Sequence, residues 1–218
     1  HAKYAAMRER SVGLGVMGLH SFLQKKSIPL ESVMSKVWNS KIFKHIQEGV
    51  DKASKKLSEE RGPCPDAEEY GFKERFSNKT AIAPTASISI ICGGASPGVE
   101  PVAANSYTHK TLSGSYNVKN KYLKKLLEKY GKDNDEIWSS ITTNQGSVKH
   151  LDFLTKDEKD VFKTAFELDQ RWIVELGADR TPYISQAQSI NIFLPADVHK
   201  KDLHQIHFQA WKKGLKSL

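Results

Sequence analysis

Residues 183–194 read Tyr-Ile-Ser-Gln-Ala-Gln-Ser-Ile-Asn-Ile-Phe-Leu, and this stretch decides the fold class. Side chains two positions apart lie on the same face of a β-strand. One face would carry Ile184, Ile190, Ile192 and Leu194 together with Gln186 and Gln188, and the other Ser185, Ala187, Ser189, Asn191 and Phe193. This alternation predicts a β-strand over the run.

Helices are predicted on both sides of this strand. Upstream, Thr155 and Glu158 have the spacing of a capping box, which opens a helix whose apolar face extends from Val161 to Leu176. Downstream, a last helix is expected from about Asp202. Strands separated by helices are typical of an α/β protein, so the predicted fold class is α/β.

Helical spacing of apolar residues predicts further helices closer to the N-terminus. They cover residues 3–26, a longer helix through 42–57, and then 120–130 and 133–143. The longer helix should stop at Gly62-Pro63, because glycine suits the left-handed position after a helix and proline cannot continue it.

The composition is that of a folded chain in a reducing compartment. Of the 218 residues, 39% are hydrophobic and 27% charged, which excludes disorder as the overall state. The two cysteines are too few to stabilise a fold of this size by disulfides, so a disulfide-rich secreted module is excluded and a cytoplasmic location is expected.

The formal net charge of +8 favours anionic partners. The longest uncharged stretch, 80–99, contains prolines, adjacent glycines and many hydroxyls, so a membrane span is not expected.

A short β-leaning segment, Thr80 to Ala83, leads into a candidate anion site. The site consists of Pro84, Thr85, Ala86, Ser87, Ile88 and Ser89. Successive backbone N–H groups after a strand, with hydroxyls alongside, can hold a phosphate. The same residue types also make ordinary polar turns, so the residues alone leave both interpretations open.

The string Gly13-Leu14-Gly15-Val16-Met17-Gly18 matches G-x-G-x-x-G, the dinucleotide-binding pattern. That pattern needs a strand before its first glycine. Here the preceding residues are helical in composition, and the apolar stripe continues through the glycines. A helix with small residues at a close packing contact is therefore preferred over a nucleotide-binding dehydrogenase.

The two cysteines and a group of histidines carry weaker signals. Cys92 has no local histidine to act as a base, so a small buried residue is predicted, and Cys64 has no evident partner. His199, His204 and His207 are close in sequence, but no Cys or carboxylate completes a metal-ligand set with them. Structural histidines are the preferred interpretation.

A row of lysines follows the predicted helix at 120–130. The lysines are at positions 119, 121, 124, 125 and 129. They could form a nucleic-acid-binding stripe, which makes a basic nucleic-acid-binding module the alternative function. A solvated helix face explains them at least as well, and no aromatic residues interleave as a stacking platform requires.

Four stretches taken together resemble the large (α) subunit of ribonucleotide reductase, most similar to class I. They are 10–19 (Arg-Ser-Val-Gly-Leu-Gly-Val-Met-Gly-Leu), 83–89 (Ala-Pro-Thr-Ala-Ser-Ile-Ser) with 98–101 (Gly-Val-Glu-Pro), 178–191 (Ala-Asp-Arg-Thr-Pro-Tyr-Ile-Ser-Gln-Ala-Gln-Ser-Ile-Asn), and 207–216 (His-Phe to Trp-Lys-Lys-Gly-Leu-Lys). Each alone is weak, but four in the family's order, over nearly the whole chain, are specific.

The resemblance implies that residues 1–218 are the C-terminal part of a ten-stranded α/β barrel domain, incomplete at both ends. The family reduces ribonucleoside diphosphates to deoxyribonucleotides through a thiyl radical on a cysteine. That cysteine, its Asn and Glu neighbours and the reducible cysteine pair are expected before His1, and the radical-relay tyrosines after Leu218. The chain alone should be inactive.

The resemblance also implies the partners. They are the N-terminal part of the same subunit, a metal-containing small subunit that supplies the radical, the diphosphate substrate, and a second copy when the subunit is complete. No metal or cofactor is expected on this chain itself, and neither Cys64 nor Cys92 matches a catalytic cysteine.

For the candidate anion site, the resemblance implies a specific role. Backbone amides and a hydroxyl in the segment matching 84–89 hold the substrate diphosphate, which favours the phosphate interpretation over the polar turn. Ile88 departs from relatives that carry a hydroxyl there, so Thr85, Ser87 or Ser89 is expected to make the side-chain contact. Residues 13–18 match a helical segment of the family. Gln186, Gln188 and Asn191 match a polar barrel strand that orders the interior.

Overall fold

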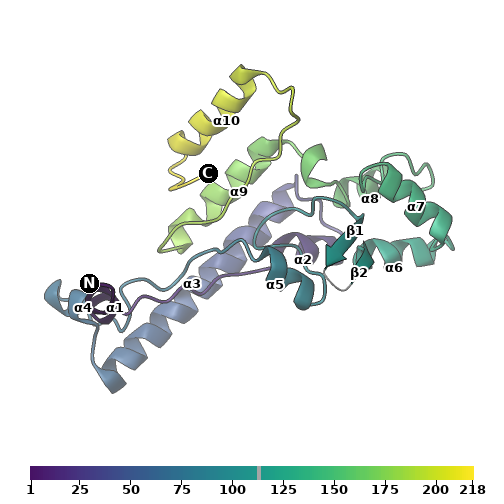
Figure 1. Ribbon diagram of the computed structural model, residues 1–218. Helices are drawn as coiled ribbons and strands as arrows, with labels where there is room; N and C mark the ends of the chain where they lie inside the picture. The colour runs from purple at the N-terminus through teal and green to yellow at the C-terminus, as the bar shows by residue number, and fades with distance from the viewer. Residues whose placement is uncertain (112–113) are drawn as a thin grey trace.

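The structure is a computed structural model that describes residues 1–111 and 114–218. The long helix α3 (Val33–Arg61) forms a diagonal axis, with the other helices spread along it (Figure 1). It begins where Ser32 accepts a hydrogen bond from the Ser35 amide, and it ends at Gly62, where φ is 77°. The stop predicted at Gly62-Pro63 is therefore confirmed. The short helices α1 (Ala2–Glu9) and α4 (Pro65–Glu69) lie together beside its C-terminal end.

Three short extended segments, remote in sequence, lie side by side and run parallel; the first is at residues 12–14, the central one at 78–82 and the third at 186–189. Residues 78–82 are the central segment. On one side, the Leu14 amide donates to the Lys79 carbonyl at 2.9 Å and the Ala81 amide donates to the Leu14 carbonyl at 3.1 Å. On the other side, the Ile82 amide donates to the Ala187 carbonyl at 3.1 Å. The bridges Leu14↔Thr80 and Ile82↔Gln188 are both parallel, so the carboxyl ends of the three segments are on the same side.

The strand predicted over 183–194 is wrong in extent. The 3₁₀ turn η2 occupies Thr181–Tyr183, and within the run only Gln188 makes a ladder bridge. The alternation did distinguish the two faces of the run. Ile184, Gln188 and Ile190, on the predicted apolar face, are buried, while Ala187, on the opposite face, is exposed. A β-strand of twelve residues needs a neighbouring strand of similar length to pair with. The central segment offers only residues 78–82, so most of the run stays unpaired with it.

The helix predicted over 3–26 is also wrong. α1 ends at Glu9, Arg10 is left-handed with φ 47°, and α2 (Leu19–Lys25) begins only after Gly18. Between them the chain is extended and pairs with the central segment. A Cβ on Gly15 would lie 2.5 Å from the Ala81 carbonyl oxygen, so the expected close packing at the glycines is confirmed, but against an extended segment.

The helix predicted from Thr155 through Leu176 begins as expected and then breaks. Its capping box is formed, but α8 (Lys156–Val161) is short and is followed by the 3₁₀ turn η1 (Ala165–Glu167) and then α9 (Gln170–Arg180). Thr164 and Glu167 make a second capping box, and the Asp169 side chain caps α9. These local caps start new helices and interrupt the apolar stripe.

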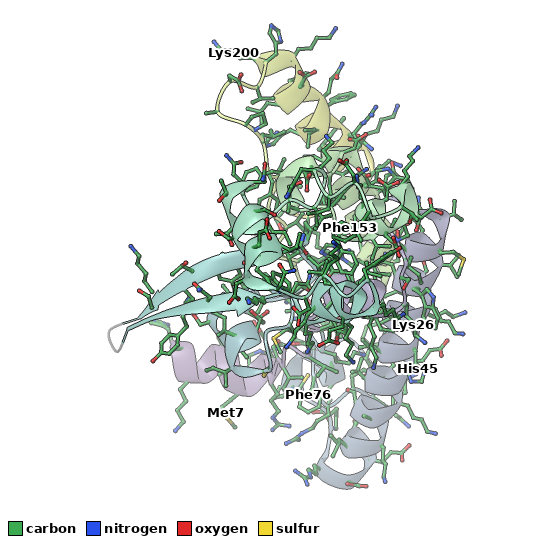
Figure 2. All side chains as sticks on the ribbon, turned by 90° about the vertical axis from the view of Figure 1, so that its right-hand side faces the viewer. Met7, Lys26, His45, Phe76, Phe153 and Lys200 are labelled. Carbon is green, nitrogen blue, oxygen red and sulfur yellow. The ribbon has the colours of Figure 1, made fainter. Side chains whose placement is uncertain are left out.

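The part of the chain between 106 and 162 forms a separate helical lobe. The hairpin of β1 (Ser106–Thr111) and β2 (Gly114–Lys119) projects from the body and leads into α6 (Lys121–Lys129) and α7 (Asp135–Thr143) (Figure 2). Both helices confirm their predictions. With α8 they enclose an apolar core that includes Leu123, Leu127, Trp138, Ile141 and Phe162. The last helix, α10 (Lys200–Lys212), begins two residues before its predicted start and lies beside α9.

Candidate functional site

The candidate anion site directly follows the central parallel segment. The chain passes through Ala83 and Pro84 and enters the short helix α5 (Ala86–Ile91). Ligand sites in parallel α/β folds lie at the carboxyl ends of the strands, which is where this loop is. Ala83, Pro84, Ala86, Ser87 and Ile88 are exposed at this end, whereas Ser89 is buried.

The shape of the loop is held by a bond between Thr85 and Gly98. Thr85 is left-handed, with φ 52°, which is a rare conformation for a β-branched residue. Its Oγ1 accepts a hydrogen bond from the Gly98 amide at 2.7 Å. Gly98 is itself left-handed, and a Cβ there would lie 2.9 Å from the Ala83 carbonyl oxygen. The loop entrance is thereby tied to the segment that returns after α5.

The first turn of α5 presents consecutive backbone amides. The Ser89 amide is the first to bond within the turn, to the Thr85 carbonyl at 2.9 Å. The N–H groups of Ala86, Ser87 and Ile88 precede it, where helix geometry provides no intrahelical acceptor. Because these three residues are exposed, the amides are placed where an anion could meet them.

The three hydroxyls of the loop have different surroundings. Thr85 Oγ1 is bound to Gly98, and Ser89, only 3% exposed, donates its hydroxyl to the Ala86 carbonyl at 2.8 Å. Ser87 is exposed, and its hydroxyl has no hydrogen-bond partner among the described residues. Ser87 is therefore the hydroxyl that remains available to a ligand.

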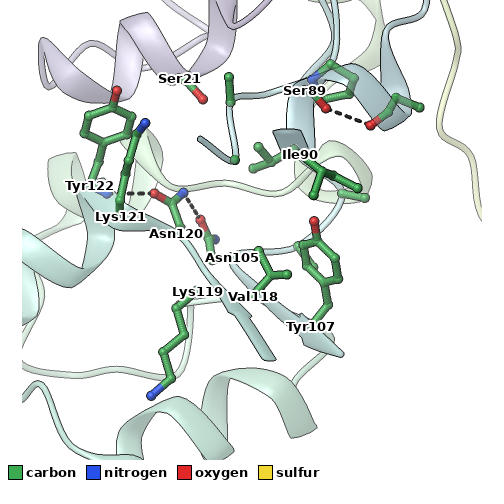
Figure 3. Close-up of a pocket in the computed structure, with 17 residues that line it drawn as sticks. Ser21, Ser89, Ile90, Asn105, Tyr107, Val118, Lys119, Asn120, Lys121 and Tyr122 are labelled. Atoms are coloured by element: carbon green, nitrogen blue, oxygen red, sulfur yellow. Dashed lines mark hydrogen bonds between the residues drawn. The ribbon is translucent and has the colours of Figure 1, made fainter. Parts of the chain in front are cut away.

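A cavity of about 300 Å³ lies behind α5, between this helix and the hairpin (Figure 3). Ala86, Ser89 and Ile90 line one side, and Tyr107 and Val118 come from the hairpin. Pro84, Thr85, Ser87 and Ile88 do not line the cavity. The site residues therefore separate into two that face the hairpin and four that do not.

A polar pair in which only Glu100 is buried joins the chain after α5 to the residues that follow the third segment. Asn191 Nδ2 donates to Glu100 Oε1 at 2.5 Å, and burial raises the pKa of Glu100 above its ordinary value. Glu100 belongs to the Gly-Val-Glu-Pro motif, yet the sequence alone suggested no role for it. The sequence did contain one signal for such a role, because Glu100 is a carboxylate within an otherwise apolar motif.

The polar residues in the third segment and just after it lie in different environments. Gln188 is buried and donates to the Gly177 carbonyl at 3.1 Å, while its Oε1 accepts from the buried Arg180 guanidinium. Gln186 is exposed. Gln188 and Asn191 thus hold neighbouring elements together, whereas the side chain of Gln186 does not.

The remaining candidates from the sequence do not gather at the loop. Cys92 is exposed at the end of α5, so its predicted burial is wrong, because α5 presents its apolar side outward; Cys64 is buried. His204 and His207 are exposed on α10, and His207 Nδ1 lies 2.9 Å from the Leu203 carbonyl oxygen. Within the described parts of the chain, no three His, Cys, Asp or Glu side chains are grouped as metal ligands.

The lysines around α6 do not form one free stripe. Lys119 donates to Asp135, Lys121 donates to the Gly93 carbonyl, and Lys124 lies within 4.0 Å of Glu128. Lys125 and Lys129 line a second cavity, among α2, α6 and α8, which is distinct from the cavity behind α5. Within residues 1–111 and 114–218, no helix combines the length and apolar character that crossing a membrane requires.

Comparison with known proteins relates this chain to one family. The family described as "Ribonucleotide reductase, barrel domain" matches residues 1–74 and 66–218. The ribonucleoside-diphosphate reductase large subunit of Invertebrate iridescent virus 6 is 48% identical over 218 residues, covering 98% of this chain and 22% of the relative. The ribonucleoside-diphosphate reductase large subunit of Invertebrate iridescent virus 3 is 45% identical over 220 residues. The alignment covers 100% of this chain and 35% of that relative.

A solved structure shows the same likeness in three dimensions. The class Id ribonucleotide reductase alpha subunit of Actinobacillus ureae aligns with a TM-score of 0.90 and 42% identity, over 98% of this chain and 39% of that one. The chain therefore spans well under half the length of the relatives it matches.

Proposed function

Because the chain belongs to the ribonucleotide reductase barrel-domain family, we propose that it forms part of the catalytic barrel of a ribonucleoside-diphosphate reductase large subunit. Within that barrel, residues 84–89 hold the diphosphate of a ribonucleoside diphosphate substrate. The observation that carries this proposal is that the exposed residues 86–88 form the first turn of α5, whose amides have no intrahelical acceptor, at the carboxyl end of the central parallel segment.

The loop acts by positioning its ligand. A diphosphate is an acceptor-rich anion, and backbone N–H groups bind it without a mobile side chain. The Ser87 hydroxyl adds one side-chain donor, while the bond between Thr85 and Gly98 keeps the loop in shape before substrate arrives. Holding the substrate tail fixes the ribose relative to catalytic groups elsewhere in the barrel.

The reducing chemistry itself is assigned to residues beyond these 218. Cys64 is fully buried, and Cys92 has no histidine close to it in sequence, so neither is given a redox role. The proposal places the radical source in a metal-containing small subunit and assigns no metal or cofactor to this chain. The chain alone is expected to be inactive.

The proposed partners follow from surfaces that this chain does not cover. Val12 and Leu14 on the first segment, and Ile91 on α5, are large apolar residues left exposed. Such surfaces suit the N-terminal part of the same barrel. The complete subunit is proposed to work as a homodimer with its small subunit, in the cytoplasm.

The test uses the complete large subunit with its small subunit and substitutes one exposed residue of the loop. Ser87→Glu places a negative charge in the first turn of α5, where it should not harm the helix but should repel a diphosphate. We expect the Kd for a ribonucleoside diphosphate to rise at least about tenfold, equivalent to roughly 1.4 kcal/mol.

The matched control is Ser87→Gln, which has the same size as the Glu variant without the charge and should weaken substrate binding much less than Glu does. Thermal unfolding of both variants should match the parent within about 0.5 kcal/mol, as for surface substitutions in general. Substrate affinity that is the same for the Glu and Gln variants would refute the loop assignment.

A further inference from the structure

A second cavity, separate from residues 84–89, lies among α2, α6 and α8. Its volume is about 510 Å³. One part of its wall is apolar and consists of Leu126, Val161 and Phe162. The other part is polar and consists of Gln24, Lys25, Ser27, Tyr122, Lys125, Lys129 and Glu158. The volume lies within the range of sites for small organic ligands.

Gln24, which lines this cavity, has a buried amide nitrogen with no acceptor among the described residues. The side-chain oxygen of Asn120 caps α6 by accepting from the amides of Tyr122 and Leu123, so the Asn120 Nδ2 must be the donor to Gln24 Oε1, at 2.9 Å. This bond in turn fixes the orientation of the Gln24 amide. Its Nε2 has no hydrogen-bond partner among the described residues, although Gln24 is only 3% exposed. A buried donor favours an acceptor, and a ligand oxygen in the cavity could serve as one for Gln24 Nε2.

The same wall has a surplus of positive charge. Lys25, Lys125 and Lys129 line the cavity, and none has a carboxylate within ion-pair distance among the described residues. The acidic residue of the wall, Glu158, is committed elsewhere, since it accepts from the Thr155 amide and the Tyr130 hydroxyl. Burial opposes ionisation of Glu158, but these bonds and the charge of Lys129 hold its pKa below the ordinary value.

We propose that this cavity binds a small organic phosphate. The three lysines neutralise the phosphate group, and Gln24 Nε2 donates to one of its oxygens. The apolar wall formed by Leu126, Val161 and Phe162 receives the organic part of the ligand. The site shares no residue with 84–89, so it is independent of the proposed diphosphate loop.

The experiment measures acylation of individual lysines in the complete large subunit by mass spectrometry. Inorganic phosphate and ribose 5-phosphate are compared with chloride at equal ionic strength. At about ten times Kd, acylation of Lys25, Lys125 and Lys129 should slow about tenfold, because the free fraction of the site falls by that factor. Lys132, which is exposed and outside the cavity, is the matched control and should react at an unchanged rate.

Two variants connect the protection to the proposed contacts. Gln24→Glu keeps the acceptor for Asn120 but replaces the donor with a negative charge, and it should abolish protection. Lys129→Gln changes an exposed residue and should weaken protection severalfold. This second variant keeps the test valid if the buried carboxylate introduced by Gln24→Glu prevents folding.

The two ligands distinguish the source of the phosphate. Stronger protection by ribose 5-phosphate supports the organic phosphate, whereas equal protection by both ligands would overturn the part of the proposal that concerns the apolar wall. Protection that chloride reproduces, or that survives Gln24→Glu in a folded protein, would overturn the site.

Discussion

The helical lobe and the region of parallel segments differ in how completely they bury their apolar residues. In the lobe, Leu123, Leu127 and Ile141 are each 0% exposed, and the helices that bury them follow one another in sequence. Around the segments, Ile88 is 56% exposed and Ile91 is 85% exposed. The lobe has a closed core of its own, whereas the segments leave apolar surface that a complete barrel would have to cover.

This difference teaches that the two regions depend on different kinds of contact. The lobe is built from neighbours along the chain, which pair with little loss of loop entropy. The segments at 12–14, 78–82 and 186–189 are brought together across long stretches of chain. We therefore expect the lobe to be the more self-sufficient of the two.

The largest effect that separates the regions is expected from truncating one apolar residue in each. Leu127→Ala should destabilise the lobe by about 3 kcal/mol, because it leaves a cavity in a closed core. Ile91→Ala in the same chain should cost less than about 0.5 kcal/mol, because its side chain is exposed. Hydrogen exchange of the lobe amides and of residues 78–91 measures both.

Repeating the Ile91→Ala measurement in the complete subunit sharpens this comparison. There we expect a larger cost, about 2 kcal/mol, since the rest of the barrel should bury the side chain. An equally small cost in the complete subunit would contradict the covering of α5.

The next effect concerns acid sensitivity in the region of the segments. His20 on α2 is buried, which lowers its pKa from 6.5 to about 4, and its Nδ1 accepts from the Val102 amide. The unfolded chain binds this proton more readily, so the stabilisation by neutral His20 is complete above pH 6.5 and is lost as the pH falls toward 4. Between pH 7 and 5, unfolding free energy should fall by about 2 kcal/mol from this group.

His20→Asn provides the control, because asparagine keeps an acceptor for Val102 but does not titrate. Urea unfolding at both pH values should show a shallower acid loss for this variant. An unchanged slope would show that other groups cause the acid sensitivity.

A smaller effect is expected at the loop itself. Thr85→Val keeps the shape of the side chain but leaves the buried Gly98 amide without its acceptor, which should cost about 1–2 kcal/mol. Thr85→Ser retains the hydroxyl and should cost less. In the complete subunit, substrate affinity should fall with the Val variant more than with the Ser variant, and the reverse order would contradict the bond's role in shaping the loop.

The smallest effect tests whether the helical lobe can be destabilised without destabilising the region of the parallel segments. Thr155→Ala removes the cap of α8 and should cost about 1 kcal/mol, while Thr155→Ser should be nearly neutral. Hydrogen exchange should accelerate in α8 and leave residues 78–82 unchanged. Equal acceleration in both regions would mean that they unfold as one unit.

The same contrast explains which predictions from sequence were accurate. α6 and α7, the stop of α3 at Gly62 and the capping box at Thr155 were predicted, because each depends on residues within a few positions. The failures lie where distant residues decide. The glycine string is extended because residues 78–82 pair with it, and Cys92 is exposed because α5 directs its apolar side outward.

For the candidate site, the sequence identified the six residues but not how they divide. Thr85, Ser87 and Ser89 carry similar hydroxyls, and no periodicity distinguishes them. Only the folded chain turns Ser89 inward to the Ala86 carbonyl, ties Thr85 to Gly98 and leaves Ser87 exposed.

The sequence by itself determined the family, the α/β class and most helices, because motifs, caps and periodicity are properties of neighbouring residues. The tertiary structure alone decided that three remote segments run parallel, that Glu100 meets Asn191, and that Gln24 is left with an unpaired donor. These features depend on contacts between residues far apart in the chain, and local patterns carry no record of which remote residues meet.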